Sequence, residues 1–414
     1  MSRVRALAGA IVVVGALLVA PAAARAQGLD RPSLSGADAA ILIEARSGNA
    51  LLERDVRERH AIASATKLMT ALLALERAEP DDLFTAPAYR ALSVESKIGL
   101  RAGERMAVRD LLKALLLESA NDAAVTIAEG VSGSRARFVA EMNDRARELG
   151  LDDTSFANPI GLDDPDNYSS ARDLARLAAL LMRKPVFAEI VDLPVAGLDS
   201  GARPRRVANR NRLVRRIPFV DGIKTGHTRS AGYVLVGSAT GSAGVRVISV
   251  VLGEPSESAR DAESLALLRY GADQFRRVRA LRARRPVERV AIKYRDERVA
   301  LVTGRGVVVT ARRGERIRTV VEAPAELEGP LPAGARVGSV SIVRGGRTVR
   351  TIDLVTAESV PGAGPLRVVT SPLGVPLTVL LFLAIVLSLT VVVGRAAGVR
   401  VRVVRRERSG SSHR

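Results

Sequence analysis

The chain has 414 residues, a formal net charge of +19 and only 3% aromatic residues. This length allows two or three domains. The positive charge of the chain comes almost entirely from arginine, without interleaved aromatic side chains, so we expect no nucleic-acid partner. Attraction to anionic lipid or wall polymer stays open. The absence of cysteine excludes disulfides and thiol catalysis, and three scattered histidines do not suggest a metal site, so we expect no cofactor.

Residues 1–26 have the organisation of a secretory signal peptide. Arg3 and Arg5 supply the charged region, residues 10–20 the apolar core, and Ala24-Arg25-Ala26 a small-x-small cleavage site. An uncleaved anchor is the alternative, but the small residues at this site favour cleavage. We therefore expect an exported protein.

Residues 35–277 are predicted to form one α+β domain. Strand patterns occur at both ends of this region, at 39–44, 50–54, 232–239 and 245–252. Helical patterns lie mainly between them, at 68–76, 108–118, 123–129, 135–149 and 171–183, with a last one at 262–275. This order favours a mainly antiparallel sheet, built from both ends of the region, with a helical cluster packed against it.

The pattern changes at residue 278. Short strands with glycine-rich turns predict a small all-β, sandwich-like domain over residues 278–360, followed by a linker at 361–372.

Residues 373–394 are uncharged and long enough to span a bilayer. By the positive-inside rule, the arginine-rich tail at 395–414 is then cytoplasmic. A buried core helix is the alternative, but globular cores rarely supply such a length without a polar face. We expect a C-terminal transmembrane helix that holds the exported domains on the outer face of the cytoplasmic membrane.

Ser64-Ala65-Thr66-Lys67 leads into an apolar-periodic segment. A serine that opens a helix and a lysine three residues later share one face of the first turn, so the amine can reach and activate the hydroxyl. The helix N-terminus also favours a developing oxyanion. Alone the motif is weak, because many helices begin with a capping serine.

Two further stretches supply the remaining parts of a serine acyl-transfer site. Ser119-Ala120-Asn121 follows a predicted helix, and Lys224-Thr225-Gly226 precedes a predicted strand. Attack on an amide needs a base, a proton relay and oxyanion donors, and a carboxylate-bearing substrate also needs a cation. Each stretch alone could simply end a helix or form a turn, but the three together at element boundaries are a strong signal.

Lysine usage strengthens this interpretation. The chain has only six lysines, and two of them, Lys67 and Lys224, occupy motif positions. Arginine could not replace Lys67 as a base, because a guanidinium does not lose its proton at ordinary pH. A buried ammonium, or one beside another cation, does so more readily.

The set S-x-x-K, S-x-N and K-T-G is the signature of penicillin-binding proteins and class A β-lactamases. The chain resembles the membrane-anchored D-alanyl-D-alanine carboxypeptidases of serine peptidase family S11, most clearly in segments 63–70, 118–123, 158–162, 168–175 and 222–228. The likeness covers residues 35 to 275 and implies a penicillin-binding/β-lactamase-like transpeptidase fold for that domain. The family usually anchors through an amphipathic helix on the membrane surface, whereas residues 373–394 are long enough to cross it.

The resemblance implies a role for each residue of the site. Ser64 would be the acylated nucleophile and Lys67 its base. Ser119 would relay a proton to the leaving D-alanine, and Asn121 would hold the substrate backbone and Lys67. Among the substrate-binding residues, Lys224, Thr225 and Gly226 would face the terminal carboxylate, and Arg260 would assist in recognising it. The backbone N–H of His227 would form an oxyanion hole with that of Ser64.

The function implied by the resemblance is a serine D,D-carboxypeptidase. It would trim the terminal D-alanine from peptidoglycan stem pentapeptides, and β-lactams would acylate Ser64. A β-lactamase is one alternative, but no Glu-x-x-Leu-Asn segment lies between Asn121 and Lys224. A D,D-endopeptidase is not separable by sequence, and the complete motif set argues against a catalytically idle wall-binding protein.

Overall fold

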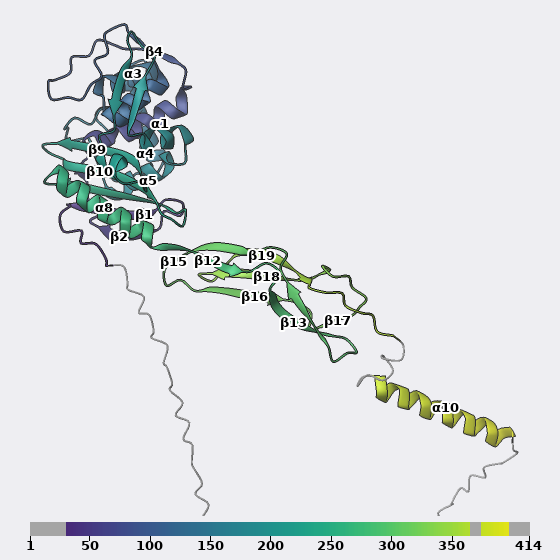
Figure 1. Ribbon diagram of the computed structural model, residues 1–414. Helices are drawn as coiled ribbons and strands as arrows, with labels where there is room; N and C mark the ends of the chain where they lie inside the picture. The colour runs from purple at the N-terminus through teal and green to yellow at the C-terminus, as the bar shows by residue number, and fades with distance from the viewer. Residues whose placement is uncertain (1–29, 365–373, 397–414) are drawn as a thin grey trace, which may run out of the picture.

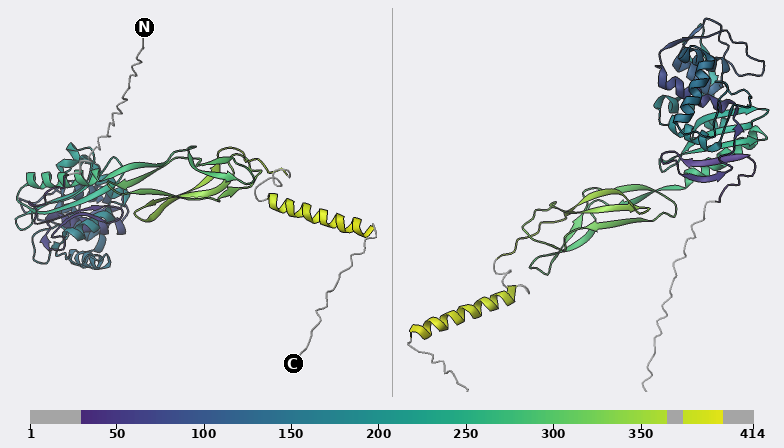
Figure 2. Two further views of the ribbon diagram at one scale, coloured as in Figure 1. Left: turned by 90° about the horizontal axis from the view of Figure 1, so that it is seen from below. Right: turned by 180° about the vertical axis from the view of Figure 1, so that it is seen from behind.

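The structure, a computed structural model, describes residues 30–364 and 374–396 (Figure 1). An α+β region is followed by an elongated all-β region and by a C-terminal helix, as Figures 1 and 2 show. The predicted signal peptide, most of the predicted linker and the tail at 397–414 lie outside the described residues. Those expectations stay predictions.

A five-stranded antiparallel sheet forms the centre of the α+β region. Its strand order is β2-β1-β11-β10-β9, so the first strand pairs with the last one in sequence, as the sequence predicts. The strands are β1 (Ala39–Glu44), β2 (Ala50–Arg54), β9 (Val220–Thr228), β10 (Gly232–Thr240) and β11 (Arg246–Glu254).

Both faces of this sheet are covered. Along β1, Ile41 and Ile43 belong to the core under the helical cluster, whereas Leu42 belongs to a second core under α8 (Glu257–Asp273). Successive side chains of a strand point to opposite faces. The continuous apolar run of β1 therefore fits a strand that is buried on both sides.

The helical cluster comprises the segments between β2 and β9, with three small strand pairs at its edges, β3–β6, β4–β5 and β7–β8. Its helices are η1 (Ala63–Thr66), α1 (Lys67–Arg77), α2 (Val108–Lys113), η2 (Ala114–Glu118), α3 (Asn121–Ser132), α4 (Arg135–Glu148), α5 (Ala171–Leu181), α6 (Pro185–Asp192) and α7 (Arg212–Arg216). The small strands are β3 (His60–Ala61), β4 (Leu83–Thr85), β5 (Arg105–Ala107), β6 (Tyr168–Ser169), β7 (Val195–Leu198) and β8 (Arg205–Ala208).

Three local features add to or correct the predictions. The stretch Lys224-Thr225-Gly226 precedes strand β10 as predicted, but it is itself part of a strand, β9, whose glycines hide the strand pattern. Helix α6, which is not among the predicted helices, follows the helix predicted over 171–183 and begins at Pro185, where the missing N–H costs nothing. The helix predicted over 108–118 is α-helical only to Lys113 and then widens into the π-helical turn η2.

The all-β region confirms the predicted second domain. A six-stranded sheet, β16-β18-β19-β14-β13-β17, packs with the pair β12–β15 around a core that includes Leu301, Val340 and Leu354. Its strands are β12 (Phe275–Leu281), β13 (Pro286–Ile292), β14 (Arg298–Val302), β15 (Val307–Arg312), β16 (Ile317–Glu322), β17 (Glu326–Leu327), β18 (Arg336–Arg344) and β19 (Arg347–Thr356).

The apolar segment near the C-terminus forms helix α10 (Gly374–Ala396). Its side chains from Val379 to Val393 are exposed. Within the described residues, however, no helix has the combined length and apolarity that crossing a bilayer requires. The structure thus provides a helix at the predicted place without supporting its transmembrane role.

Buried carboxyl groups meet where β11 ends against α8. Glu254 is 1% exposed, and neither of its carboxyl oxygens has a hydrogen-bond partner within the described residues. A Cβ on Gly36 would lie 2.9 Å from Glu254 Oε1 and 2.8 Å from Glu263 Oε2, so both carboxyl groups border the same glycine. Burial, contact with Glu263 and the charge of Asp38 raise the pKa of Glu254 to about 7.

We expect Glu254→Gln to stabilise the protein at pH 8 and to have little effect near pH 4.5. Because the folded-state pKa of Glu254 is raised above its usual value of 4.5, stability falls as the pH rises from about 4.5 through 7. The full penalty is on the order of 3 kcal/mol, which glutamine removes. Thermal unfolding at pH 4.5 and pH 8 measures the change in stability, with Glu189→Gln as the exposed control. Destabilisation of Glu254→Gln at pH 8 would contradict the expectation.

Candidate active site

Ser64 lies in the 3₁₀ turn η1, which leads directly into α1. Lys67, the first residue of α1, donates a hydrogen bond from Nζ to Ser64 Oγ at 2.9 Å. The same amine donates to the carbonyl oxygen of Ile160, and the Lys67 side chain is fully buried. The geometry that the S-x-x-K spacing predicts is therefore present, and a hydroxyl and a buried amine are in direct contact.

Burial sets the protonation of this amine. It lowers the pKa of Lys67 from 10.5 to about 7, with Glu95 opposing the shift and Arg210 adding to it. A desolvated ammonium is disfavoured because the protein interior does not replace its hydration. A substantial fraction of Lys67 is therefore neutral near pH 7 and able to accept a proton.

Two glycines let neighbouring segments close on the Ser64 backbone. A Cβ on Gly226 of β9 would lie 3.1 Å from the Ser64 nitrogen, closer than nine in ten real contacts of that kind. A Cβ on Gly161, which has φ +87°, would lie 2.0 Å from the Ala63 carbonyl oxygen. The K-T-G strand and the loop around Ile160 thus pack against the serine because neither has a side chain there.

Lys224 brings a second buried amine to the same place. It is 1% exposed, and its Nζ donates to the Thr225 carbonyl oxygen at 2.7 Å. Its pKa is held well below the usual value, first by burial and then by the positive charges of Lys67, Arg210 and Arg260. The charges of Lys67, Arg210 and Arg260 therefore all act on the Lys224 amine.

Ser119 and Asn121 flank the junction between η2 and α3. Ser119 is 5% exposed and has a left-handed backbone, φ 64°, which turns the chain sharply between the two helices. Asn121 Nδ2 donates to Glu95 Oε2 at 2.7 Å. Within the described residues, the partners of Lys67 Nζ are Ser64 and Ile160, so the contact implied between Asn121 and Lys67 is absent from this arrangement.

His227 and Arg260 both lie near the ring of Tyr233. The rings of His227 and Tyr233 stack with centroids 4.0 Å apart, and the Arg260 guanidinium lies 5.9 Å from the Tyr233 ring centroid. Arg260 is 3% exposed and pairs with Asp261 at 2.7 Å and with Glu257 at 3.3 Å. The His227 side chain is occupied by stacking, which agrees with a role for its backbone alone.

Sequence reasoning missed Glu95 and Arg210. The negative charge of Glu95 raises the pKa of Lys67 and so favours its protonated form. Arg210 lowers the pKa values of Lys67 and Lys224. Arg210 is held by Glu118 at 2.8 Å and by its backbone bond to Leu117. Nothing in the spacing distinguishes this arginine from the many others, and Glu95 lies in an irregular loop far from each motif.

The comparisons with known proteins agree with this geometry. The family model described as D-alanyl-D-alanine carboxypeptidase, peptidase family S11, matches residues 26–256. The chain belongs to this family. A second model, the C-terminal domain of penicillin-binding protein 5, matches residues 275–362, and together they confirm a penicillin-binding domain followed by a β-domain.

Individual members of the family match over most of their length. D-alanyl-D-alanine carboxypeptidase DacF of Bacillus subtilis is 31% identical over 338 residues, 79% of this chain and 87% of the relative. DacC of Escherichia coli is 34% identical over 84% of this chain and 90% of its own. The crystal structure of penicillin binding protein 5 from Haemophilus influenzae matches with a TM-score of 0.58 and 32% identity, over 81% of this chain and all of that one.

These relatives identify the activity. The protein is a serine-type D-alanyl-D-alanine carboxypeptidase, as the motifs predict. The β-lactamase, D,D-endopeptidase and wall-binding alternatives are not favoured by any of these matches.

Proposed function

We propose that this carboxypeptidase removes the terminal D-alanine from peptidoglycan stem pentapeptides through an acyl-enzyme on Ser64. The observation that carries the proposal is the 2.9 Å contact between Ser64 Oγ and the buried Lys67 amine. A serine hydroxyl is a weak nucleophile until a neighbouring base accepts its proton. Lys67, with its pKa lowered to about 7, is that base.

In acylation, Ser64 Oγ attacks the carbonyl carbon of the penultimate D-alanine while its proton passes to Lys67. The developing oxyanion accepts hydrogen bonds from the backbone N–H groups of Ser64 and His227. The C–N bond then breaks, and the leaving amine takes the proton from Lys67 through Ser119. Water then attacks the ester carbonyl and gives a proton to Lys67. The bond between the carbonyl carbon and Ser64 Oγ breaks, Ser64 Oγ takes that proton from Lys67, and the shortened peptide leaves with a new C-terminal carboxyl group.

Substrate recognition follows from the excess of positive charge in the pocket. Lys224, Thr225 and Arg260 would bind the carboxylate of the terminal D-alanine, with Gly226 leaving room beside Ser64. The pKa of Lys224 is lowered by neighbouring cations, so a bound carboxylate would relieve that repulsion. Asn121, fixed by Glu95, would donate to the peptide backbone.

The same pocket would accept β-lactams as covalent inhibitors. Their strained amide presents a carbonyl carbon to Ser64 and a carboxylate to Lys224 in the arrangement proposed for the peptide. Attack opens the ring and leaves the acyl group on Ser64. Because the leaving amine stays attached to that acyl group, it blocks the approach of water, and the ester persists.

We also propose that α10 anchors the enzyme in the cytoplasmic membrane, with the catalytic domain on the outer face and the tail in the cytoplasm. The support comes from the sequence, in which residues 373–394 are uncharged and arginines follow residue 394, whereas the described helix alone does not reach the length and apolarity of a membrane span. We expect the full chain to stay in the membrane pellet after an alkaline carbonate wash and a chain ending at residue 364 to be released. Release of the full chain would instead indicate a surface-lying helix.

We expect Ser64→Ala to abolish labelling by a fluorescent penicillin and to reduce D-alanine release from a D-Ala-D-Ala peptide by about 10⁴-fold or more, because the nucleophile is lost. Thermal unfolding verifies that the variant is folded. Ser242→Ala, in the exposed turn between β10 and β11, is the matched control and keeps both activities. Unchanged release from Ser64→Ala would refute the acyl-enzyme.

We expect kcat/KM for D-alanine release to rise with pH through about 7, because only neutral Lys67 accepts the Ser64 proton. Glu95→Gln removes the charge that favours protonated Lys67, so the rising limb of the profile of kcat/KM against pH moves to lower pH. Glutamine keeps one acceptor oxygen, which can serve Asn121 and Tyr89, while the backbone N–H of Leu92 loses its acceptor.

Glu79 is an exposed glutamate outside the pocket. The pH profile of kcat/KM for Glu79→Gln therefore serves as the reference. A limb that stays in place or moves upward in Glu95→Gln would show that Glu95 does not set the protonation of Lys67.

A further inference from the structure

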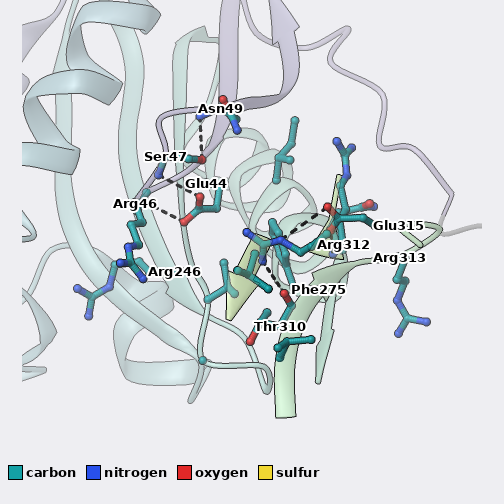
Figure 3. Close-up of a pocket in the computed structure, with 18 of the residues that line it drawn as sticks. Glu44, Arg46, Ser47, Asn49, Arg246, Phe275, Thr310, Arg312, Arg313 and Glu315 are labelled. Atoms are coloured by element: carbon teal, nitrogen blue, oxygen red, sulfur yellow. Dashed lines mark hydrogen bonds and ion pairs between the residues drawn. The ribbon is translucent and has the colours of Figure 1, made fainter. Parts of the chain in front are cut away.

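A large cleft lies between the catalytic domain and the β-domain (Figure 3). Its volume is about 1470 Å³. One wall is formed by the turn between β1 and β2, the end of α5 and the start of β11, and the other by β15, β18 and β19. None of the residues assigned to the active site lines it.

The side chains that line this cleft are strongly unbalanced in charge. Two carboxylates, Glu44 and Glu315, face seven arginines. The whole chain has 63 basic against 44 acidic residues, so the arginine-rich composition alone does not account for this ratio. The seven are Arg46, Arg183, Arg246, Arg312, Arg313, Arg344 and Arg350.

Most of this positive charge is not neutralised inside the protein. The Glu44 carboxylate accepts hydrogen bonds from the backbone N–H groups of Arg46 and Ser47, at 2.9 and 3.0 Å. Arg246 pairs with Asp221 at 3.3 Å, and Arg344 lies 3.7 Å from Glu315.

The other five arginines of the cleft have no carboxylate within ion-pair distance in the described part of the chain. Two of them are nevertheless held in place by backbone carbonyl oxygens. Arg183 donates to the carbonyl of Arg46 at 3.2 Å, and Arg313 to that of Asp273 at 2.6 Å. Their guanidinium groups are therefore oriented by the fold while their charges stay available to a ligand.

We propose that this cleft binds a linear carboxylate polymer, namely a second segment of the wall polymer whose stem peptides the enzyme trims. The ligand class follows from the guanidinium groups, which bind carboxylates with paired hydrogen bonds. The shape disfavours a small ion, which would not fill the volume, and a flat bilayer, which cannot enter a concave cleft. Guanidinium groups also pair with phosphates, and we choose the carboxylate polymer because the peptides trimmed at Ser64 carry carboxylates. The identity of the polymer rests on the proposed function.

Binding at this cleft would hold the enzyme on its substrate. A polymer segment that touches both walls keeps neighbouring stem peptides near Ser64 and raises their effective concentration. The effect is confined to polymeric substrate, because a short peptide cannot occupy both sites. The cleft therefore lowers KM for wall polymer without changing the chemistry at Ser64.

The test replaces three unpaired arginines, one from the catalytic domain and two from the β-domain. We expect Arg46→Gln/Arg312→Gln/Arg350→Gln in the full chain to weaken binding to poly-L-glutamate by about tenfold at low salt. High salt should abolish the difference, because surface charges are screened. Release of D-alanine from a blocked L-Lys-D-Ala-D-Ala peptide should be unchanged, while KM for peptidoglycan rises.

Two further triple variants make the result interpretable. Arg105→Gln/Arg289→Gln/Arg318→Gln removes the same charge from exposed positions outside the cleft and should bind poly-L-glutamate as the wild type does. Arg46→Lys/Arg312→Lys/Arg350→Lys keeps the charge but loses the paired hydrogen bonds, so it should bind more tightly than the glutamine variant and less tightly than the wild type. Unchanged D-alanine release from the short peptide shows that the glutamine variant is folded.

The proposal is overturned if the glutamine variant of the cleft binds poly-L-glutamate like the wild type, or if the control outside the cleft loses as much. It also fails if only binding to phosphatidylglycerol vesicles declines, which would assign these arginines to the membrane surface. Failure of the proposed function is distinguishable from these outcomes, because it would appear as absent D-alanine release from the short peptide in the wild type.

Discussion

The site depends on one buried amine in contact with one hydroxyl. Lys67 has no exposed surface, and this burial is the largest influence that lowers its pKa to about 7. An exposed lysine at the same spacing would stay protonated at neutral pH and could not serve as a base. The Ile160 carbonyl and the close approach of Gly226 and Gly161 to the Ser64 backbone maintain that burial.

The architecture concentrates positive charge and then compensates for it in part. Lys67 and Lys224 come from segments that the central sheet and the helical cluster bring together, and the charge of Lys67 lowers the pKa of Lys224. Glu95, Glu118 and Asp261 offset part of this repulsion through contacts with Asn121, Arg210 and Arg260. The remaining positive potential suits a substrate that ends in a carboxylate.

The β-domain adds a second region of unbalanced charge. Its strands β15, β18 and β19 face the catalytic domain across a cleft in which five of the seven arginines lack acidic partners within the described residues. The catalytic pocket and this cleft share no residue, so recognition of the peptide end and attachment to the polymer would be separable properties of one chain. Both depend on arginines or lysines that the fold brings together from distant segments.

The sequence by itself determined the family, the three motifs, the contact of Ser64 with Lys67, the pairing of both ends of the catalytic domain and the all-β character of residues 278–360. These features are local, or follow from hydrophobic periodicity, so they can be recognised without a fold. Only the tertiary structure decided that Lys224 lies inside strand β9 and that seven arginines line one cleft. It also decided that Glu95 and Arg210 act on Lys67 and that Asn121 binds Glu95. These features depend on burial and on distances between remote segments, which no local pattern encodes.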